Sequence, residues 1–208
     1  SQDRMNELCK KHWGTMVGIL SVAVVPLAFV DRVNRYTLLP QLAVALLGVL
    51  VGYLGWLLYG VRQSDSRAIP LALGFLLVEL LSVVSAHSPG QSLVPVLTDF
   101  VYVSLLVIVA TGLTRSQIER TVGAASLVCG IVSLIGLLQY FDIGREWVPT
   151  SGLPSGTLGH RNFAAAYAVV MIPFVLWKLR QATNRWHCLL WTFCSSLCLA
   201  FIIATRSR

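Results

Sequence analysis

The chain has 208 residues, of which 56% are hydrophobic and only 12% are charged, with a mean hydropathy of +0.73. A soluble domain carries about 25% charged residues, and no polar stretch here is long enough to fold as one. The formal charge of +7 comes from Lys and Arg that flank apolar runs, so it indicates membrane topology and not a nucleic-acid partner.

Charged residues are gathered in short clusters between long apolar runs, which is typical of a polytopic membrane protein. A spanning helix needs about 20 mostly apolar residues. We predict about seven spanning helices, near residues 13–30, 36–61, 68–86, 94–113, 121–141, 162–177 and 186–205. The fold class is therefore an all-α transmembrane bundle, with residues 1–208 forming a single integral membrane region.

Two connections between the predicted helices differ from the others. Residues 87–92 (HSPGQS) are a simple turn signal, whereas residues 142–161 form the longest polar connection. The sixth run, 162–177, would span only about 24 Å at 1.5 Å per residue, less than the ~30 Å hydrocarbon core. We therefore expect that helix to recruit His160 and Arg161, to tilt little, or to lie where the bilayer is thin.

The distribution of Lys and Arg predicts the orientation. With the N-terminus in the cytoplasm, ten of these residues fall on the inner side and six on the outer side, as the positive-inside rule favours. This orientation makes residues 142–161 an extracytoplasmic loop. It also places residues 205–208 (TRSR), which follow the seventh run, on the same outer side.

The loop that enters the sixth helix contains the most chemically suggestive residues. Gly156 and Gly159 could let backbone N–H groups approach a ligand closely. Asn162 is a good N-cap for the helix, and a helix N-terminus favours anions. Arg161 can bind phosphate bidentately, and His160 titrates near neutrality. The pattern predicts an anion-binding corner; the alternative is an ordinary interfacial His-Arg pair.

Four further residues attract attention. Glu79 and Asp99 lie within apolar runs, where a charge is costly and a functional or paired role is the default hypothesis. They would lie at similar depth in the outer half of the membrane and could neutralise Arg161 or Arg206, although protonated or snorkelling carboxyls are an equal alternative. Arg206 and Arg208 could bind phosphate oxygens with help from Thr205 and Ser207, or could be an ordinary basic helix end.

The five cysteines give no sign of a metal site. Four of them, Cys129, Cys188, Cys194 and Cys198, lie in apolar runs, and the chain has no CxxC motif or zinc-type Cys/His spacing. We interpret them as packing residues, with Cys194 and Cys198 on one helix face. No metal or other cofactor is predicted.

Residues 156–165 (GTLGHRNFAA), an apolar helix containing Pro173, and the TRSR sequence after the next helix together resemble the bacterial O-antigen ligase/polymerase superfamily. Many members have Gly-x-x-x-Asn-x-Asn in this loop; here His160 replaces the first Asn and Asn162 keeps the second. The earlier helices match only in hydrophobicity, so the resemblance covers the front part of a protein with about twelve helices.

The resemblance implies a glycosyltransferase of the bacterial inner membrane. Such an enzyme takes a glycan from an undecaprenyl-diphosphate carrier on the periplasmic face and transfers it to lipid A core, to another glycan or to a protein. By motif, Arg206 and, less directly, Arg161 would hold the diphosphate, with His160, Asn162, Gly159 and Arg208 around them. The catalytic histidine of the family would lie in a periplasmic loop beyond Arg208, so we expect the 208 residues alone to be inactive.

Two other functions fit the same composition. A membrane transporter, for bicarbonate or another anion, could use Glu79 and Asp99 to line its path. A non-catalytic membrane scaffold is the third alternative. The ligase, polymerase and protein glycosylase activities share this loop, so the sequence does not separate them.

Overall fold

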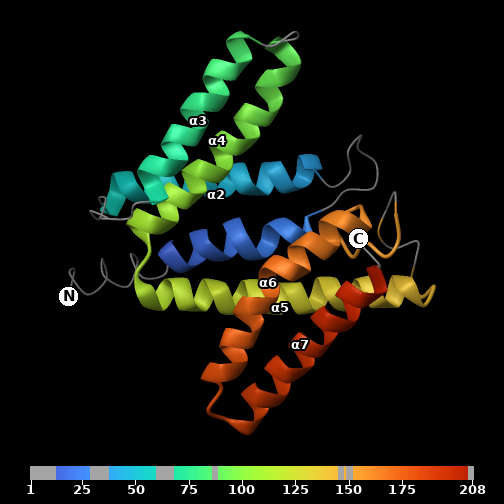
Figure 1. The fold of residues 1–208 in the computed structure, drawn as a ribbon. Helices are drawn as coiled ribbons and strands as arrows, with labels where there is room; N and C mark the ends of the chain where they lie inside the picture. The colour runs from blue at the N-terminus through green and yellow to red at the C-terminus, as the bar shows by residue number, and fades with distance from the viewer. Residues whose placement is uncertain are drawn as a thin grey trace, which may run out of the picture. The chain divides into compact units, whose positions relative to one another are not determined.

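The computed structural model describes residues 13–28, 38–59, 68–85, 89–144, 148 and 152–205, and this part of the chain is all-α (Figure 1). Residues 13–18 are α-helical and continue into a π-helical stretch, Ile19–Val24, and a 3₁₀ turn, Val25–Leu27. The α-helices that follow are α2 (Leu38–Tyr59), α3 (Ala68–Val84), α4 (Pro89–Gly112), α5 (Arg115–Tyr140), α6 (Arg161–Gln181) and α7 (Arg185–Thr205).

Five of these helices are long and apolar enough to cross a membrane. The candidate spans are Pro40–Leu58, Pro95–Gly112, Arg115–Tyr140, Arg161–Gln181 and Arg185–Thr205, and Ile69–Val84 is a shorter apolar helix. By helix length and hydropathy, the chain is a multi-pass membrane protein. The all-α prediction is therefore confirmed. Five of the seven expected spans reach full length, whereas α3, at 1.5 Å per residue, is about 26 Å long.

Helix α5 begins six residues earlier than the predicted run. The Gln117 Oε1 atom accepts hydrogen bonds from the Thr114 backbone N–H (2.7 Å) and the Thr114 hydroxyl (2.9 Å). This contact between the residue before the helix and the third residue inside it is half of a capping box. Arg115 and Arg120 consequently lie in the first turns of α5 and not in a separate loop.

Two other predicted boundaries were also wrong. Helix α6 runs from Arg161 to Gln181, so it is about 31 Å long at 1.5 Å per residue and spans the hydrocarbon core; it recruits Arg161 and four residues after Trp177. Helix α4 already begins at Pro89, inside the predicted turn, because proline is well suited to the first helical position, where its missing N–H has no partner to lose.

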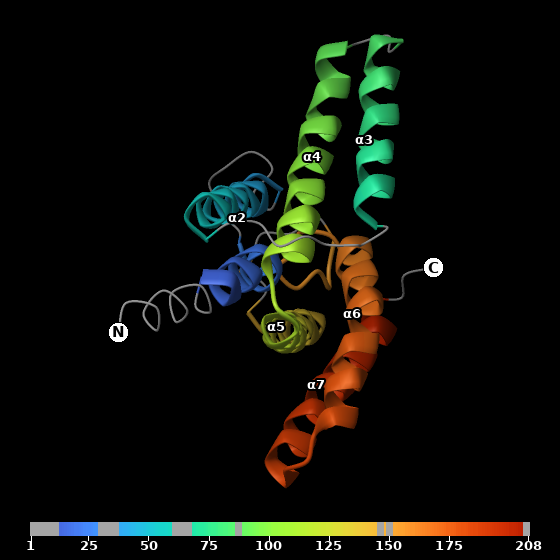
Figure 2. The ribbon, with the colours of Figure 1, turned by 90° about the vertical axis from the view of Figure 1, so that its left-hand side faces the viewer.

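The chain divides into two compact units, one formed by residues 1–21 and 45–118 and the other by residues 22–44 and 119–208. In the first unit, α3 and α4 lie side by side as a hairpin in both views (Figures 1 and 2). The Trp13 indole N–H donates to the Val51 carbonyl (2.9 Å), and the Tyr53 hydroxyl lies 3.4 Å from the Ser104 Oγ atom. These bonds hold the first helical stretch to α2, and α2 to α4.

In the second unit, α6 and α7 form another hairpin, again visible in both views (Figures 1 and 2). Four of the five buried residues of α7 recur at helical spacing and form one stripe, Cys194, Cys198, Phe201 and Thr205; the fifth is Ser195. Helix α5 meets this stripe with small residues, since a side chain on Gly130 would contact Cys194 and one on Gly136 would overlap Phe201. Small residues of this kind allow close approach of membrane helices.

Candidate functional site

A cavity of about 610 Å³ lies in the second unit, where the end of α5, the start of α6 and the end of α7 meet the connecting loop. Its walls are formed by Gln139, Tyr140, Phe141, Asp142, Leu153, Pro154, Arg161, Ala204 and Thr205. Arg161 and Thr205 come from the two motifs that the sequence analysis selected separately. The fold therefore brings the start of α6 and the end of α7 to one cavity.

Arg161 is the cation of this cavity. It is the first residue of α6 and its side chain is exposed. Thr205, the last residue of α7, is buried, and its hydroxyl donates to the Ile202 carbonyl at 2.7 Å. In this structure the hydroxyl proton is used inside the helix, and donation from Thr205 to a phosphate stays a prediction. Arg206, Ser207 and Arg208 lie outside the described residues.

The connecting loop is held in place by Gln139, which is 2% exposed. Its Oε1 atom accepts from the backbone N–H groups of Ser155 (3.0 Å) and Gly156 (2.9 Å), and its Nε2 atom donates to the Gly156 carbonyl (3.1 Å). One side-chain amide thus bonds three backbone groups of the turn, which lie outside any helix and have no helical hydrogen-bond partner. Sequence reasoning missed this residue, although Gln139 is the only side-chain amide in the run 121–141.

Gly156 has a structural role that differs from the expected one. Its φ angle is +56°, and a Cβ atom there would lie 2.8 Å from the Val132 carbonyl oxygen. Since its N–H is bound by Gln139, the proposed approach of this N–H to a ligand is wrong. Gly159 also has a left-handed backbone, with φ of +77°, and is buried. Glycine is needed at Gly156 for both conformation and space.

Helix α6 is capped by His160 and not by Asn162. The His160 Nδ1 atom accepts a hydrogen bond from the Asn162 backbone N–H (3.2 Å), and the ring stacks edge-on against Phe163. The Arg161 N–H is bound by the Gly152 carbonyl (3.0 Å). The first two N–H groups of α6 are thus used within the protein, so the guanidinium of Arg161 is the main feature here that could attract an anion.

Asp142 is a second charged residue of the cavity wall, one that the sequence analysis did not select. Helix α5 ends in a Schellman motif, in which the Ile143 N–H bonds the Leu138 carbonyl (2.9 Å) and the Asp142 N–H bonds the Gln139 carbonyl (3.1 Å). Asp142 takes the left-handed position of the motif with φ of +65°. Glycine is the usual residue at this position, and Asp and Asn adopt a positive φ more readily than other non-glycine residues.

Glu79 and Asp99 are brought together in the first unit. Their carboxyl groups face each other across the α3–α4 hairpin within hydrogen-bonding reach, and the Glu79 Oε2 atom is shielded from solvent. The expectation that they neutralise Arg161 or Arg206 stays a prediction.

Three of the four described cysteines of the second unit are packing residues, as predicted, whereas Cys188 is exposed. Cys129, Cys194 and Cys198 are buried free thiols, and the Cys129 and Cys198 sulfur atoms are 3.5 Å apart. Among the described residues, His, Cys, Asp and Glu form no group of three or more suited to a metal ion.

Comparisons with protein-family models, with curated proteins and with solved structures find no match to this chain. The cavity and the sequence resemblance are therefore the features of the protein that point to a function.

Proposed function

We propose that the protein is an O-antigen ligase/polymerase-like glycosyltransferase, which moves a glycan from an undecaprenyl-diphosphate carrier to lipid A core, a glycan chain or a protein. The observation that carries the proposal is the cavity in which Arg161 and the end of α7 meet. Arg206 follows that helix end directly in the sequence. The guanidinium of Arg161 in this cavity would suit a diphosphate, which an arginine can bind bidentately.

The chemistry proposed for these residues is binding and charge stabilisation. When the glycan is transferred, the carrier leaves as a diphosphate, and fixed cations lower the barrier by stabilising the negative charge that develops on it. The acceptor hydroxyl would also need a general base, which the resemblance assigns to a residue beyond Arg208. In the predicted orientation, the protein lies in a bacterial inner membrane, its N-terminus is in the cytoplasm and the cavity faces the periplasm.

Binding of undecaprenyl diphosphate to the purified protein in detergent tests the proposal. We expect Arg161→Ala to weaken binding by about 10- to 100-fold, since a hydrogen bond to a charged group contributes about 1.5–3 kcal/mol. Arg120→Ala is the matched control, because Arg120 is an exposed cation near the opposite end of α5. Equal binding by both variants and the parent protein would rule out a carrier site at Arg161.

A transporter is the second candidate, and the facing carboxyl groups of Glu79 and Asp99 favour it. Glu79→Gln separates the two functions. This substitution lies in the other unit, so a glycosyltransferase should bind the carrier lipid unchanged. A transporter should instead lose anion uptake in proteoliposomes.

A further inference from the structure

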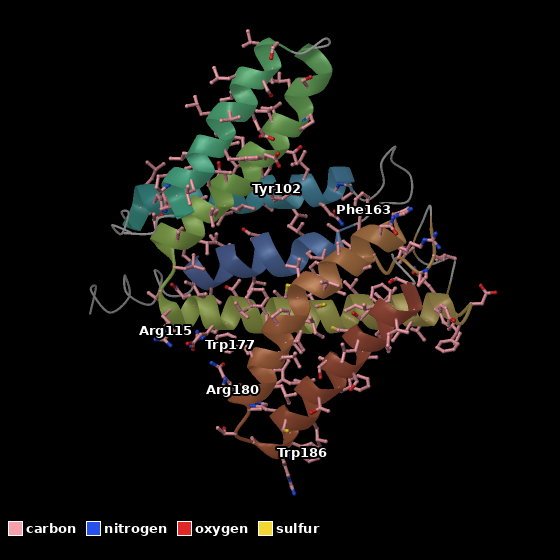
Figure 3. The ribbon with its side chains drawn as sticks, viewed as in Figure 1. Tyr102, Arg115, Phe163, Trp177, Arg180 and Trp186 are labelled. Atoms are coloured by element: carbon pink, nitrogen blue, oxygen red, sulfur yellow. The ribbon has the colours of Figure 1, made fainter. Side chains whose placement is uncertain are left out.

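The turn between α6 and α7 combines tryptophans and cations at one end of the hairpin. Figure 3 shows Trp177, Arg180 and Trp186 at this end, where the two helices meet. Two cations lie over the neighbouring rings: the Lys178 Nζ atom is 5.0 Å from the Trp177 ring centre, and the Arg185 guanidinium is 5.3 Å from that of Trp186. Hereafter, residues 177–187 are called the hairpin tip.

The hairpin tip is open to its surroundings. Trp186 is 64% exposed, and Arg180, Arg185 and His187 are exposed as well. Lys178 is partly buried, because its side chain runs past Gly123 of α5. The tip therefore presents cations and indole rings on one surface at the end of two apolar helices.

The α6–α7 hairpin itself carries charge of one sign. No Asp or Glu occurs between Trp147 and the end of the chain at Arg208, so the hairpin carries no carboxylate of its own. Tryptophan prefers the headgroup level of a bilayer, and Lys and Arg next to it are attracted to anionic headgroups. A free anion would explain the cations but not the two exposed indole rings beside them.

We propose that the hairpin tip is a binding surface for anionic phospholipid headgroups, selective for phosphatidylglycerol-type lipids over zwitterionic ones. Arg180 and Lys178 contact the phosphate groups, and Trp186 lies at the boundary between headgroups and acyl chains. This surface is at the opposite end of α6 from Arg161, so it does not depend on the carrier-lipid site.

Quenching of Trp186 fluorescence by brominated lipids measures this preference. The protein is reconstituted in its full length with every other tryptophan replaced by Phe, in bilayers of phosphatidylcholine with increasing brominated phosphatidylglycerol. We expect the anionic lipid to be preferred at Trp186 by several-fold. Arg180→Gln and Lys178→Gln should each reduce the preference by up to about fivefold, as expected for one cation near an anionic surface.

Arg161→Gln is the matched control, because it removes the same charge from the opposite end of the same helix. It should leave the lipid preference at Trp186 unchanged. Equal quenching by anionic and zwitterionic brominated lipids in the parent protein would overturn the proposal. A loss of preference in Arg161→Gln as large as that in Arg180→Gln would also overturn it, because net charge and not the hairpin tip would then be responsible.

Discussion

At the scale of single residues, Gln139 explains why the cavity has a defined wall. Its side chain replaces the backbone partners that a buried turn lacks, and a buried N–H or carbonyl without a partner costs about 1–3 kcal/mol. The same loop contains Gly152, whose carbonyl accepts a hydrogen bond from the Arg161 backbone N–H. The position of Arg161, the cation of the cavity, therefore depends in part on the side-chain amide of Gln139 in α5.

We expect Gln139→Leu to destabilise the protein by about 2–4 kcal/mol, because it removes the partner of two buried N–H groups, those of Ser155 and Gly156, and leaves the Gly156 carbonyl with only the long bond from the Ser155 hydroxyl (3.5 Å). At acidic pH, Gln139→Glu should cost less, since a protonated carboxyl group still accepts from the N–H groups of Ser155 and Gly156 and can donate to the Gly156 carbonyl, whereas an ionised carboxylate would be a buried charge. The measurement is the half-life of the folded protein in detergent at fixed temperature, which suits a membrane protein that unfolds irreversibly. Equal half-lives for Gln139→Leu and the parent would show that the amide bonds contribute little.

At the scale of elements, the packing interface between α5 and α7, called the seam below, determines how closely the end of α7 approaches the cavity. A Cβ atom on Gly136 would lie 2.1 Å from the Cε2 atom of Phe201, and Phe201 is fully buried. The two helices can therefore adopt this spacing only if residue 136 has no side chain. Because Thr205 lies one helical turn beyond Phe201, a wider seam would also move the cavity wall.

Gly136→Ala should destabilise the seam by about 1–3 kcal/mol, the usual cost of inserting atoms into a packed interior. Gly74→Ala is the control, because nothing lies within 4 Å of a Cβ atom there and alanine is the better helix former. The half-life assay described for Gln139 applies. Adding Phe201→Leu should restore part of the stability lost in Gly136→Ala; a further loss would show that the overlap with the ring is not the cause.

At the scale of the whole molecule, the predicted orientation can be tested by thiol labelling. Ser155 is fully buried, so a cysteine there would not be labelled on either side. Ile143 is 51% exposed and belongs to the loop that is predicted to lie outside. With Cys9→Ser as background, a membrane-impermeant maleimide should label Ile143→Cys in intact cells. Cys188, exposed at the start of α7, should react only after the membrane is opened. The reverse pattern would contradict both the orientation and the proposed site.

Much of the architecture followed from the sequence. Apolar runs bounded by charges predicted the helices, because a span must exclude charge over about 20 residues. The errors occurred at helix ends, where Gln117 and Pro89 extend helices through polar residues. Hydropathy does not detect such capping contacts, because their stabilisation comes from hydrogen bonds and backbone geometry and not from apolar area.

By itself, the sequence determined that this is a multi-pass membrane protein and that a helix lies near residues 162–177, since both follow from local composition. Only the tertiary structure decided that the start of α6 and the end of α7 share one cavity, that Gln139 secures the loop between α5 and α6, and that Glu79 faces Asp99. The physical reason is that these contacts join residues far apart in the chain. Their energies depend on which helix faces meet, and small residues such as Gly136 allow the faces to meet closely.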